Sequence, residues 1–378
     1  MRILLFDMDG VLLEPHAYHR ALIDTVSHVG RVLGYGDVLI DGTEIMAFEA
    51  AGVSSEWDSA AICAVLLLQN LWREYPSATL PDASLARVLP EHAVAPPPFR
   101  PFIGSLSRAD LRELSPLLRA EHLLLSGPGP RTLMQRQAIQ AILHKARQID
   151  GSLTHRIFQE LVLGSREFAL IYALPPLMDT ASYLREYDLP TLPAHTQVRL
   201  ARWLQEDDHW ASIFTSRPSR PVGDQFCTPE AEIGVRSVGL ENLPVIGLGG
   251  LSWLSVHRDC GPDAFLKPSP AHALAALRVA LSGDVQEALE AAAALVLDGR
   301  VDRVWNDLSG AEIYVFEDTA GGMQSARAAR ELLERHGVKI KLSLFGITDS
   351  EAKRQALEAM GATVVSSLSV ALDHLPGF

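Results

Sequence analysis

The chain has 378 residues, which exceeds the usual length of one domain, so two folded units or one domain with a large insertion is expected. Hydrophobic residues make up 48% of it, enough for a sizeable core. The formal net charge of −13, with scattered basic residues, lacks the basic stripe of a nucleic-acid-binding protein and argues against a nucleic-acid partner.

Targeting and membrane signals are weak. The apolar run Ile3–Phe6 before Asp7 is too short for a signal peptide, and Ala64–Leu68 is too short to span a bilayer. The cysteines Cys63, Cys227 and Cys260 have no metal-ligand spacing and are expected to be ordinary buried thiols of a reducing compartment. We therefore expect a cytoplasmic protein without a membrane partner.

The first predicted strand, Ile3–Phe6, ends in Asp7-Met8-Asp9-Gly10. Side chains at positions i and i+2 of a strand project to the same face, so Asp7 and Asp9 are expected to share one site at the carboxyl end of the strand. Two clustered carboxylates repel unless a cation or a proton intervenes. The pattern suits an aspartyl nucleophile beside a metal ion.

The following stretch, residues 15–205, lacks strand-like alternation and is predicted to be an inserted helical domain. One helical face is marked by apolar or small residues, namely Tyr18, Leu22, Thr25, Val26 and Val29. A second is marked by Leu133, Met134, Ile139, Ile142 and Leu143. The segment Leu189–Pro193 is expected to be a return linker.

From about Trp210 the chain alternates short apolar runs with amphipathic helices, which is typical of βαβ units. The predicted strands are Ala211–Thr215, Leu243–Gly247, Glu312–Phe316, Lys341–Phe345 and Ala362–Val365, with Pro270–Leu297 a helix or helix pair. With Ile3–Phe6 they would form one parallel sheet. The predicted fold is an α/β, Rossmann-like core over residues 1–14 and 206–378 with a large α-helical cap over 15–205.

Three further segments have the composition that phosphoryl transfer needs. The strand ending at Thr215-Ser216 offers hydroxyl and backbone N–H groups to a phosphoryl oxygen. Lys267, flanked by Pro268 and Pro270, offers a compact positive charge in a stiff turn. Glu317-Asp318 ends an apolar strand and offers the hard oxygen ligands that suit Mg²⁺.

These four segments, in this order, resemble the motifs of the haloacid dehalogenase superfamily, specifically its phosphatase and phosphomutase branch. The matching strings are Asp7-Met-Asp9-Gly, the strand-ending Thr215, Lys267-Pro-Ser-Pro and Glu317-Asp-Thr-Ala-Gly-Gly322. The resemblance covers about the first fourteen residues and the last ~175. The inserted middle is unlike the caps of that family and much larger.

The resemblance implies that Asp7 attacks phosphorus and forms an aspartyl-phosphate, and that Asp9 is the general acid and base. It implies a Mg²⁺ ion bound by Asp7, Glu317, Asp318 and the backbone carbonyl of Asp9. Without the metal, carboxylates within ~6 Å would repel by about a kcal/mol or more per pair, so the site should be strained or partly protonated.

It also implies that Thr215 and Lys267 clamp the transferring phosphoryl group. Ser216 is a possible helper of Thr215, and Arg217 a candidate contact for a second anionic group on the substrate. His19 lies shortly after the first motif, and the resemblance makes it a candidate contact of Asp9 when the domains close over the substrate.

The leading hypothesis is a Mg²⁺-dependent hydrolase of phosphate monoesters that acts on a small phosphorylated metabolite, with sugar phosphates among the candidates. A phosphomutase with the same aspartyl-phosphate, or a non-catalytic binding protein on this fold, is the alternative. Asp9 argues against haloacid substrates, because dehalogenases of the superfamily carry a different residue there. The sequence leaves the substrate and the oligomeric state open.

Overall fold

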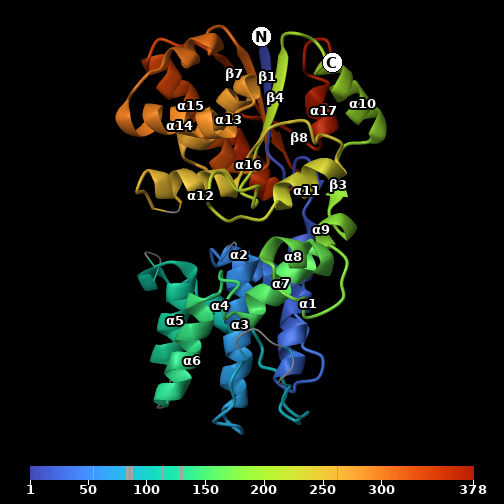
Figure 1. Ribbon diagram of the computed structural model, residues 1–378, viewed down its shortest axis with the longest axis vertical. Helices are drawn as coiled ribbons and strands as arrows, with labels where there is room; N and C mark the ends of the chain where they lie inside the picture. Colours follow the sequence, from blue (N-terminus) through green and yellow to red (C-terminus); the bar gives the residue numbers. More distant parts are fainter. Residues whose placement is uncertain (54, 82–84, 86–87, 112–113, 128–130, 262) are drawn as a thin grey trace. The chain divides into compact units, whose positions relative to one another are not determined.

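The computed structural model describes residues 1–378 except 54, 82–84, 86–87, 112–113, 128–130 and 262 (Figure 1). The chain forms two compact units. The first contains Met1–Pro15 and Asp188–Phe378, and the second contains His16–Tyr187. The first unit is therefore assembled from two segments that lie far apart in the sequence.

A six-stranded parallel sheet forms the centre of the first unit, in the order β5-β4-β1-β6-β7-β8. Its strands are β1 (Arg2–Phe6), β4 (His209–Phe214), β5 (Val245–Ile246), β6 (Glu312–Glu317), β7 (Lys341–Ile347) and β8 (Thr363–Val365). Each predicted strand is present within a few residues of its expected bounds. The predicted α/β fold with a parallel, Rossmann-like sheet is confirmed.

Alternate residues of the central strands face two separate apolar clusters. On β1, Ile3 and Leu5 belong to one cluster, whereas Leu4 and Phe6 belong to the other. Both faces of the sheet are thus buried, which explains why these strands are continuous apolar runs.

Helices cover both faces of the sheet. Residues of α12, α13, α14 and α15 contribute to the first cluster, and residues of α10, α11 and α17 to the second. In Figure 1, α13, α14 and α15 lie on the side of the sheet opposite α10 and α17. The helices of this unit are α10 (Ala194–Trp203), α11 (Glu230–Ser237), α12 (Leu248–His257), α13 (Pro270–Ser282), α14 (Val285–Asp298), η2 (Arg303–Leu308), α15 (Ala320–Arg335), α16 (Glu351–Ala359) and α17 (Leu368–Leu372).

The insertion leaves and rejoins the first unit at a short antiparallel ribbon of β2 (Leu13–Glu14) and β3 (Leu189–Pro190). The chain returns at Asp188, earlier than the boundary expected after residue 205. The physical reason is that α10 buries Leu200 and Trp203 in a cluster with residues of the sheet. The segment expected to be a linker is thus partly a strand and belongs to the first unit.

The second unit is helical, as its periodicity indicates. Its elements are α1 (His16–Val32), α2 (Gly42–Ala50), α3 (Glu56–Leu71), α4 (Arg100–Ser105), η1 (Ala109–Leu111), α5 (Pro116–Ser126), α6 (Leu133–His144), α7 (Leu153–Leu163), α8 (Ser165–Tyr172) and α9 (Tyr183–Glu186). Helix α1 packs against α3 and α7, and the ring of Tyr18 stacks on Phe158. The predicted face of α1 is therefore confirmed, with Leu22, Val26 and Val29 buried.

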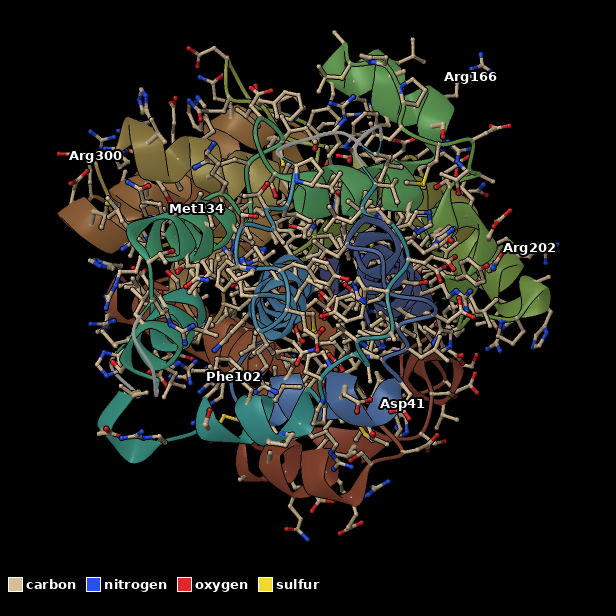
Figure 2. The ribbon with its side chains drawn as sticks, turned by 90° about the horizontal axis from the view of Figure 1, so that it is seen from below. Asp41, Phe102, Met134, Arg166, Arg202 and Arg300 are labelled. Atoms are coloured by element: carbon tan, nitrogen blue, oxygen red, sulfur yellow. The ribbon has the colours of Figure 1, made fainter. Side chains whose placement is uncertain are left out.

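The predicted face of α6 is only partly correct. Ile139 and Leu143 are buried, but Leu133 and Met134 at the start of the helix are exposed, and Figure 2 labels Met134 there. The first turn of α6 is fixed instead by Thr132, whose side chain accepts a hydrogen bond from the backbone N–H of Gln135.

The three cysteines differ in how deeply they are buried. Cys63 is buried as expected, whereas Cys227 and Cys260 are only partly buried. Among the described residues, no helix combines the length and the apolar character needed to cross a membrane.

Candidate functional site

Three adjacent strands of the first unit carry polar residues at their carboxyl ends. Asp7 follows β1, Thr215 follows β4, and Glu317 ends β6 with Asp318 directly after it. These are the positions where parallel α/β sheets bind ligands. Residues more than 300 positions apart are brought to one edge because β1 pairs with both neighbours in register.

Stacked aromatic rings fix the strands just before these residues. Phe6 and Phe316 are partners across β1 and β6, with ring centroids 5.0 Å apart, and Phe316 stacks on Phe345 of β7 at 5.5 Å. This apolar ladder lies one residue before Asp7 and Glu317. The carboxylates are therefore presented by a rigid, buried layer.

The carboxylates of Asp7, Glu317 and Asp318 form one buried cluster. An oxygen from each lies within 4.8 Å of the others. Their exposed fractions are 6%, 0% and 9%. Burial of three acidic groups is costly unless cations or protons compensate them.

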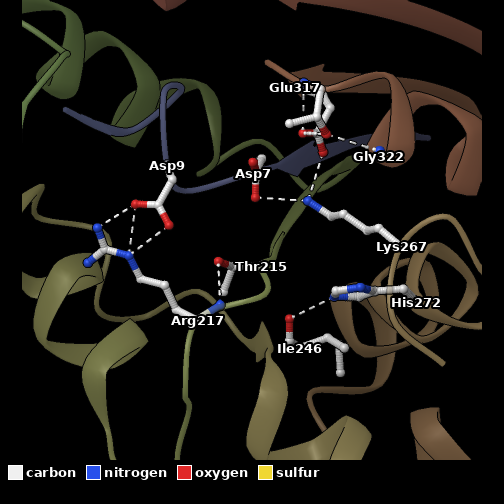
Figure 3. A network of polar contacts seen from close by, with 10 residues as sticks. Asp7, Asp9, Thr215, Arg217, Ile246, Lys267, His272, Glu317 and Gly322 are labelled. Carbon is white, nitrogen blue, oxygen red and sulfur yellow. Dashed lines mark hydrogen bonds and ion pairs between the residues drawn. The ribbon is translucent and has the colours of Figure 1, made fainter. Parts of the chain in front are cut away.

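Two lysines supply part of that compensation. The Nζ of Lys267 donates to Asp7 at 2.8 Å and to Glu317 at 2.7 Å (Figure 3). It also lies 4.0 Å from the ring centroid of Phe214, a cation–π distance. The Nζ of Lys353, near the start of α16, donates to Asp318 at 2.5 Å.

The pKa values in the cluster reflect burial and mutual repulsion. Burial, followed by the charge of Asp7, raises the pKa of Glu317 to about 8, and the same two causes raise the pKa of Asp318. Burial works against the charged form of Lys267, but Asp7 and Glu317 outweigh it and raise its pKa. The expected partial protonation of the metal-free cluster therefore applies to Glu317.

His272, close to Lys267, behaves differently. Its Nε2 lies 3.2 Å from the carbonyl oxygen of Ile246 (Figure 3). Its ring meets that of Phe214 edge-on. Burial and then the charge of Lys267 lower its pKa to about 3. His272 is therefore neutral, and it packs against Phe214, whose ring also contacts Lys267.

Glu317 is held by Thr319, the residue that caps the N-terminus of α15. Its Oε1 accepts hydrogen bonds from the backbone N–H and the hydroxyl of Thr319, at 3.2 and 2.7 Å. The Thr319 hydroxyl in turn accepts from the N–H of Gly322. A Cβ at Gly322 would lie 1.7 Å from Glu317 Oε2, so only glycine leaves room for this carboxylate.

Thr215 is buried, and its hydroxyl accepts a hydrogen bond from the backbone N–H of Arg217 at 3.2 Å. Ser216, its predicted helper, is exposed. Both lie in the loop after β4, at the edge of the sheet that carries Asp7. Their contact with a phosphoryl group stays a prediction.

Asp9 and Arg217 form a pair that the sequence analysis does not anticipate. The carboxylate of Asp9 accepts hydrogen bonds from Arg217, whereas that of Asp7 faces Lys267 (Figure 3). The side chains of Asp7 and Asp9 thus have different partners. Arg217 is buried and also pairs with Asp188.

His19 lies on α1 in the helical unit. Its Nε2 lies 3.5 Å from Glu49 and 3.8 Å from Glu56 of the same unit. Its contact with Asp9 stays a prediction.

Lys353 and Asp188 are site residues that sequence reasoning missed. Lys353 stands in the first turn of the helix that follows β7, and a lysine there is ordinarily a solvated residue. Asp188 lies within residues 15–205, which the sequence analysis assigned to the insertion. Only the position of β7 beside β6 and the return of the chain at Asp188 bring these side chains to the site.

The cluster of Asp7, Glu317 and Asp318 fits a hard divalent cation. Its donors are carboxylate oxygens, the ligands that Mg²⁺ prefers. With all three carboxylates ionised, as ligation requires, and both lysines charged, the group has a formal charge of −1 that a cation would offset. This fit follows from the donor set and its charge.

The fold and site define an α/β protein with a buried acidic cluster at the carboxyl edge of a parallel sheet. No family model matches the chain, and no curated protein does. An X-ray structure of the Northeast Structural Genomics Consortium, target ZR25, is similar with a TM-score of 0.57 and 14% identity, covering 99% of this chain and 98% of that one. This similarity supports the fold.

A second solved structure is the phosphatase Tt82 from Thermococcus thioreducens. It has a TM-score of 0.41 and 14% identity, covering 94% of this chain and 99% of that one. A likeness at this level carries no argument about the present chain.

Proposed function

We propose that this protein is a Mg²⁺-dependent phosphatase that hydrolyses a small phosphorylated metabolite through an aspartyl-phosphate on Asp7. The observation that carries the proposal is the buried group of Asp7, Glu317 and Asp318 with Lys267, at the carboxyl ends of adjacent parallel strands. Carboxylates and a fixed ammonium group in this arrangement suit phosphoryl transfer, where positioning and charge stabilisation dominate catalysis.

Asp7 is the nucleophile of the proposed reaction. A carboxylate oxygen of Asp7 forms a bond to phosphorus while the bond from phosphorus to the leaving oxygen breaks. Lys267 holds one Asp7 oxygen at 2.8 Å, which orients the carboxylate, and its positive charge offsets the charge of the phosphoryl oxygens. The hydroxyl of Thr215 provides a further contact for that group.

Asp9 is the proton carrier of the proposed reaction. It gives a proton to the leaving oxygen, and then takes one from the water that attacks the aspartyl-phosphate. It is suited to exchange protons because its side chain is 37% exposed, whereas those of Asp7 and Glu317 are buried.

Asp7, Glu317 and Asp318, with the backbone carbonyl of Asp9, would hold the Mg²⁺ ion. When bound, it would supply positive charge that offsets the carboxylates and the phosphoryl oxygens. The helical unit, residues 16–187, is proposed to be the cap of this enzyme.

Release of inorganic phosphate from a panel of phosphate monoesters, with Mg²⁺ or with EDTA, tests the proposal. We expect hydrolysis only with the metal, and a fall to background for Asp7→Asn, because the amide is not a nucleophile. Asp208→Asn is a matched control, since Asp208 is 83% exposed and precedes β4 at the opposite end of the strands.

Three other results would contradict the proposal. Equal hydrolysis by the wild type and Asp7→Asn would exclude Asp7 as nucleophile. Interconversion of phosphate isomers without phosphate release would indicate a phosphomutase. Absence of turnover with every ester would favour a binding protein on this fold.

A further inference from the structure

Arg217 is a buried arginine that joins two carboxylates. Its Nε donates to both oxygens of Asp9, at 2.9 and 3.0 Å, and its Nη2 donates to Asp9 as well. Its Nη1 lies 2.8 Å from Asp188. The side chains of Arg217 and Asp188 are 1% and 0% exposed, so this pair is fixed inside the protein, whereas Asp9 reaches partly into solvent.

The surroundings of Arg217 hold it in place. Its backbone N–H donates to the Thr215 hydroxyl at 3.2 Å, and its carbonyl accepts from the N–H of Leu248 at the start of α12. Helix α11 packs closely beside the guanidinium, because a Cβ at Gly234 would lie 3.4 Å from Nη1. Arg217 is thus held through its backbone, its guanidinium and a packed helix.

Asp188 is the buried counter-ion of Arg217. A buried arginine without a counter-ion costs several kcal/mol, and Asp188 supplies that counter-ion. Asp188 thus gives the guanidinium a buried ionic partner besides Asp9. The planar fork of arginine sets the plane of the Asp9 carboxylate by binding both oxygens.

We propose that Arg217, anchored by Asp188, is a positioning residue that fixes the direction of the Asp9 carboxylate for proton transfer. This inference depends on the proposed function, in which Asp9 is the general acid and base. A carboxylate that rotated freely would seldom point along the direction that proton transfer requires.

The kinetic test compares Arg217→Lys with the wild type. Lysine keeps the charge but cannot bind both oxygens in one plane. Because a misdirected catalytic group reacts slowly, we expect kcat to fall by about 10²-fold, while KM changes by less than about threefold. Arg220→Ala, which removes an exposed arginine three residues further on, should leave both constants within about twofold of the wild type.

The structural test is independent of turnover. Crystal structures of the wild type and of the double variant Arg217→Met with Asp188→Asn, which leaves no unpaired buried charge, would show the direction of Asp9. We expect the carboxylate against Arg217 in the wild type, and turned away or in two orientations in the variant. Circular dichroism verifies that each variant is folded.

The outcomes separate this inference from the proposed function. Wild-type kcat in folded Arg217→Lys, or an unchanged Asp9 direction in the double variant, would overturn the inference while the phosphatase activity stands. If the wild type hydrolyses no ester, the proposed function fails, and the crystal structures alone decide whether Arg217 directs Asp9.

Discussion

At the scale of single residues, the candidate site is dominated by the problem of burying negative charge. Three carboxylates, two of them with raised pKa values, are held against Lys267 and Lys353. Such a group is poorly compensated by lysines alone, because two positive charges face three carboxylates. We therefore expect the metal-free protein to gain stability when a divalent cation binds.

Gly322→Ala tests how tightly Glu317 is placed. A methyl group there would overlap the Glu317 carboxylate, so we expect a loss of about 1–3 kcal/mol in the free energy of unfolding. The displaced carboxylate should also reduce the rise in Tm that Mg²⁺ produces. Thermal unfolding with and without Mg²⁺ measures both effects.

Gly321→Ala is the matched control on the same turn of α15. No atom lies within 4 Å of a Cβ at Gly321, so alanine should be neutral or stabilise the protein by up to about 1 kcal/mol. Equal Mg²⁺ responses in the two variants would show that the Glu317 carboxylate is not required for metal binding.

At the scale of elements, the short strands of the sheet are fixed by apolar side chains that alternate between two clusters.

Helix α7 of the helical unit buries a titratable residue. His155 on α7 is packed edge-on against Trp57, with ring centroids 5.2 Å apart. Burial, and then the charge of Arg147, lower its pKa to about 4.

This lowered pKa predicts that the helical unit is sensitive to acid. The unfolded chain binds a proton at His155 below about 6.5, whereas the folded chain does so only below about 4. The contribution of His155 to stability is therefore present above 6.5 and lost as the pH falls through this window, by about 1–3 kcal/mol.

His155→Gln should make the Tm less dependent on pH between about pH 7 and pH 5. The measurement is thermal unfolding followed by circular dichroism at both pH values. His195→Gln, which changes an exposed histidine of α10, should keep the pH dependence of the wild type. An unchanged dependence in His155→Gln would refute the assignment of this effect to His155.

At the scale of the whole molecule, the chain is organised as one fold interrupted by another. Among the residues that the structure describes, the two apolar clusters around the sheet draw their members from the first unit. The points where the insertion leaves and rejoins are neighbours, because Glu14 pairs with Leu189 in the β2–β3 ribbon. A short connection could therefore replace the insertion.

Replacing residues 16–187 by a short glycine-serine linker should leave the first unit folded. We expect cooperative thermal unfolding and a rise in Tm with Mg²⁺ comparable to that of the full chain, since Asp7, Glu317 and Asp318 remain. A chain without a cooperative transition would show that the first unit depends on the helical unit for its stability.

The sequence by itself determined the elements of this protein and the candidate residues at their ends. Apolar runs of strand length, helical periodicity and polar residues after the strands are local features, and they predicted the parallel sheet, the helical insertion and the positions of Asp7, Thr215 and Glu317. Lys267 could be singled out because prolines flank it. These local patterns need no knowledge of distant partners.

The tertiary structure alone decided which charged groups pair. Arg217, a candidate contact for a second anionic group of the substrate, lies 208 positions from Asp9, and the fold places it between Asp9 and Asp188. Lys353 reaches Asp318 only because β7 lies beside β6. The return of the chain at Asp188 was likewise set by the burial of Leu200 and Trp203. Such choices depend on which side chains share a buried volume, and no local pattern encodes that.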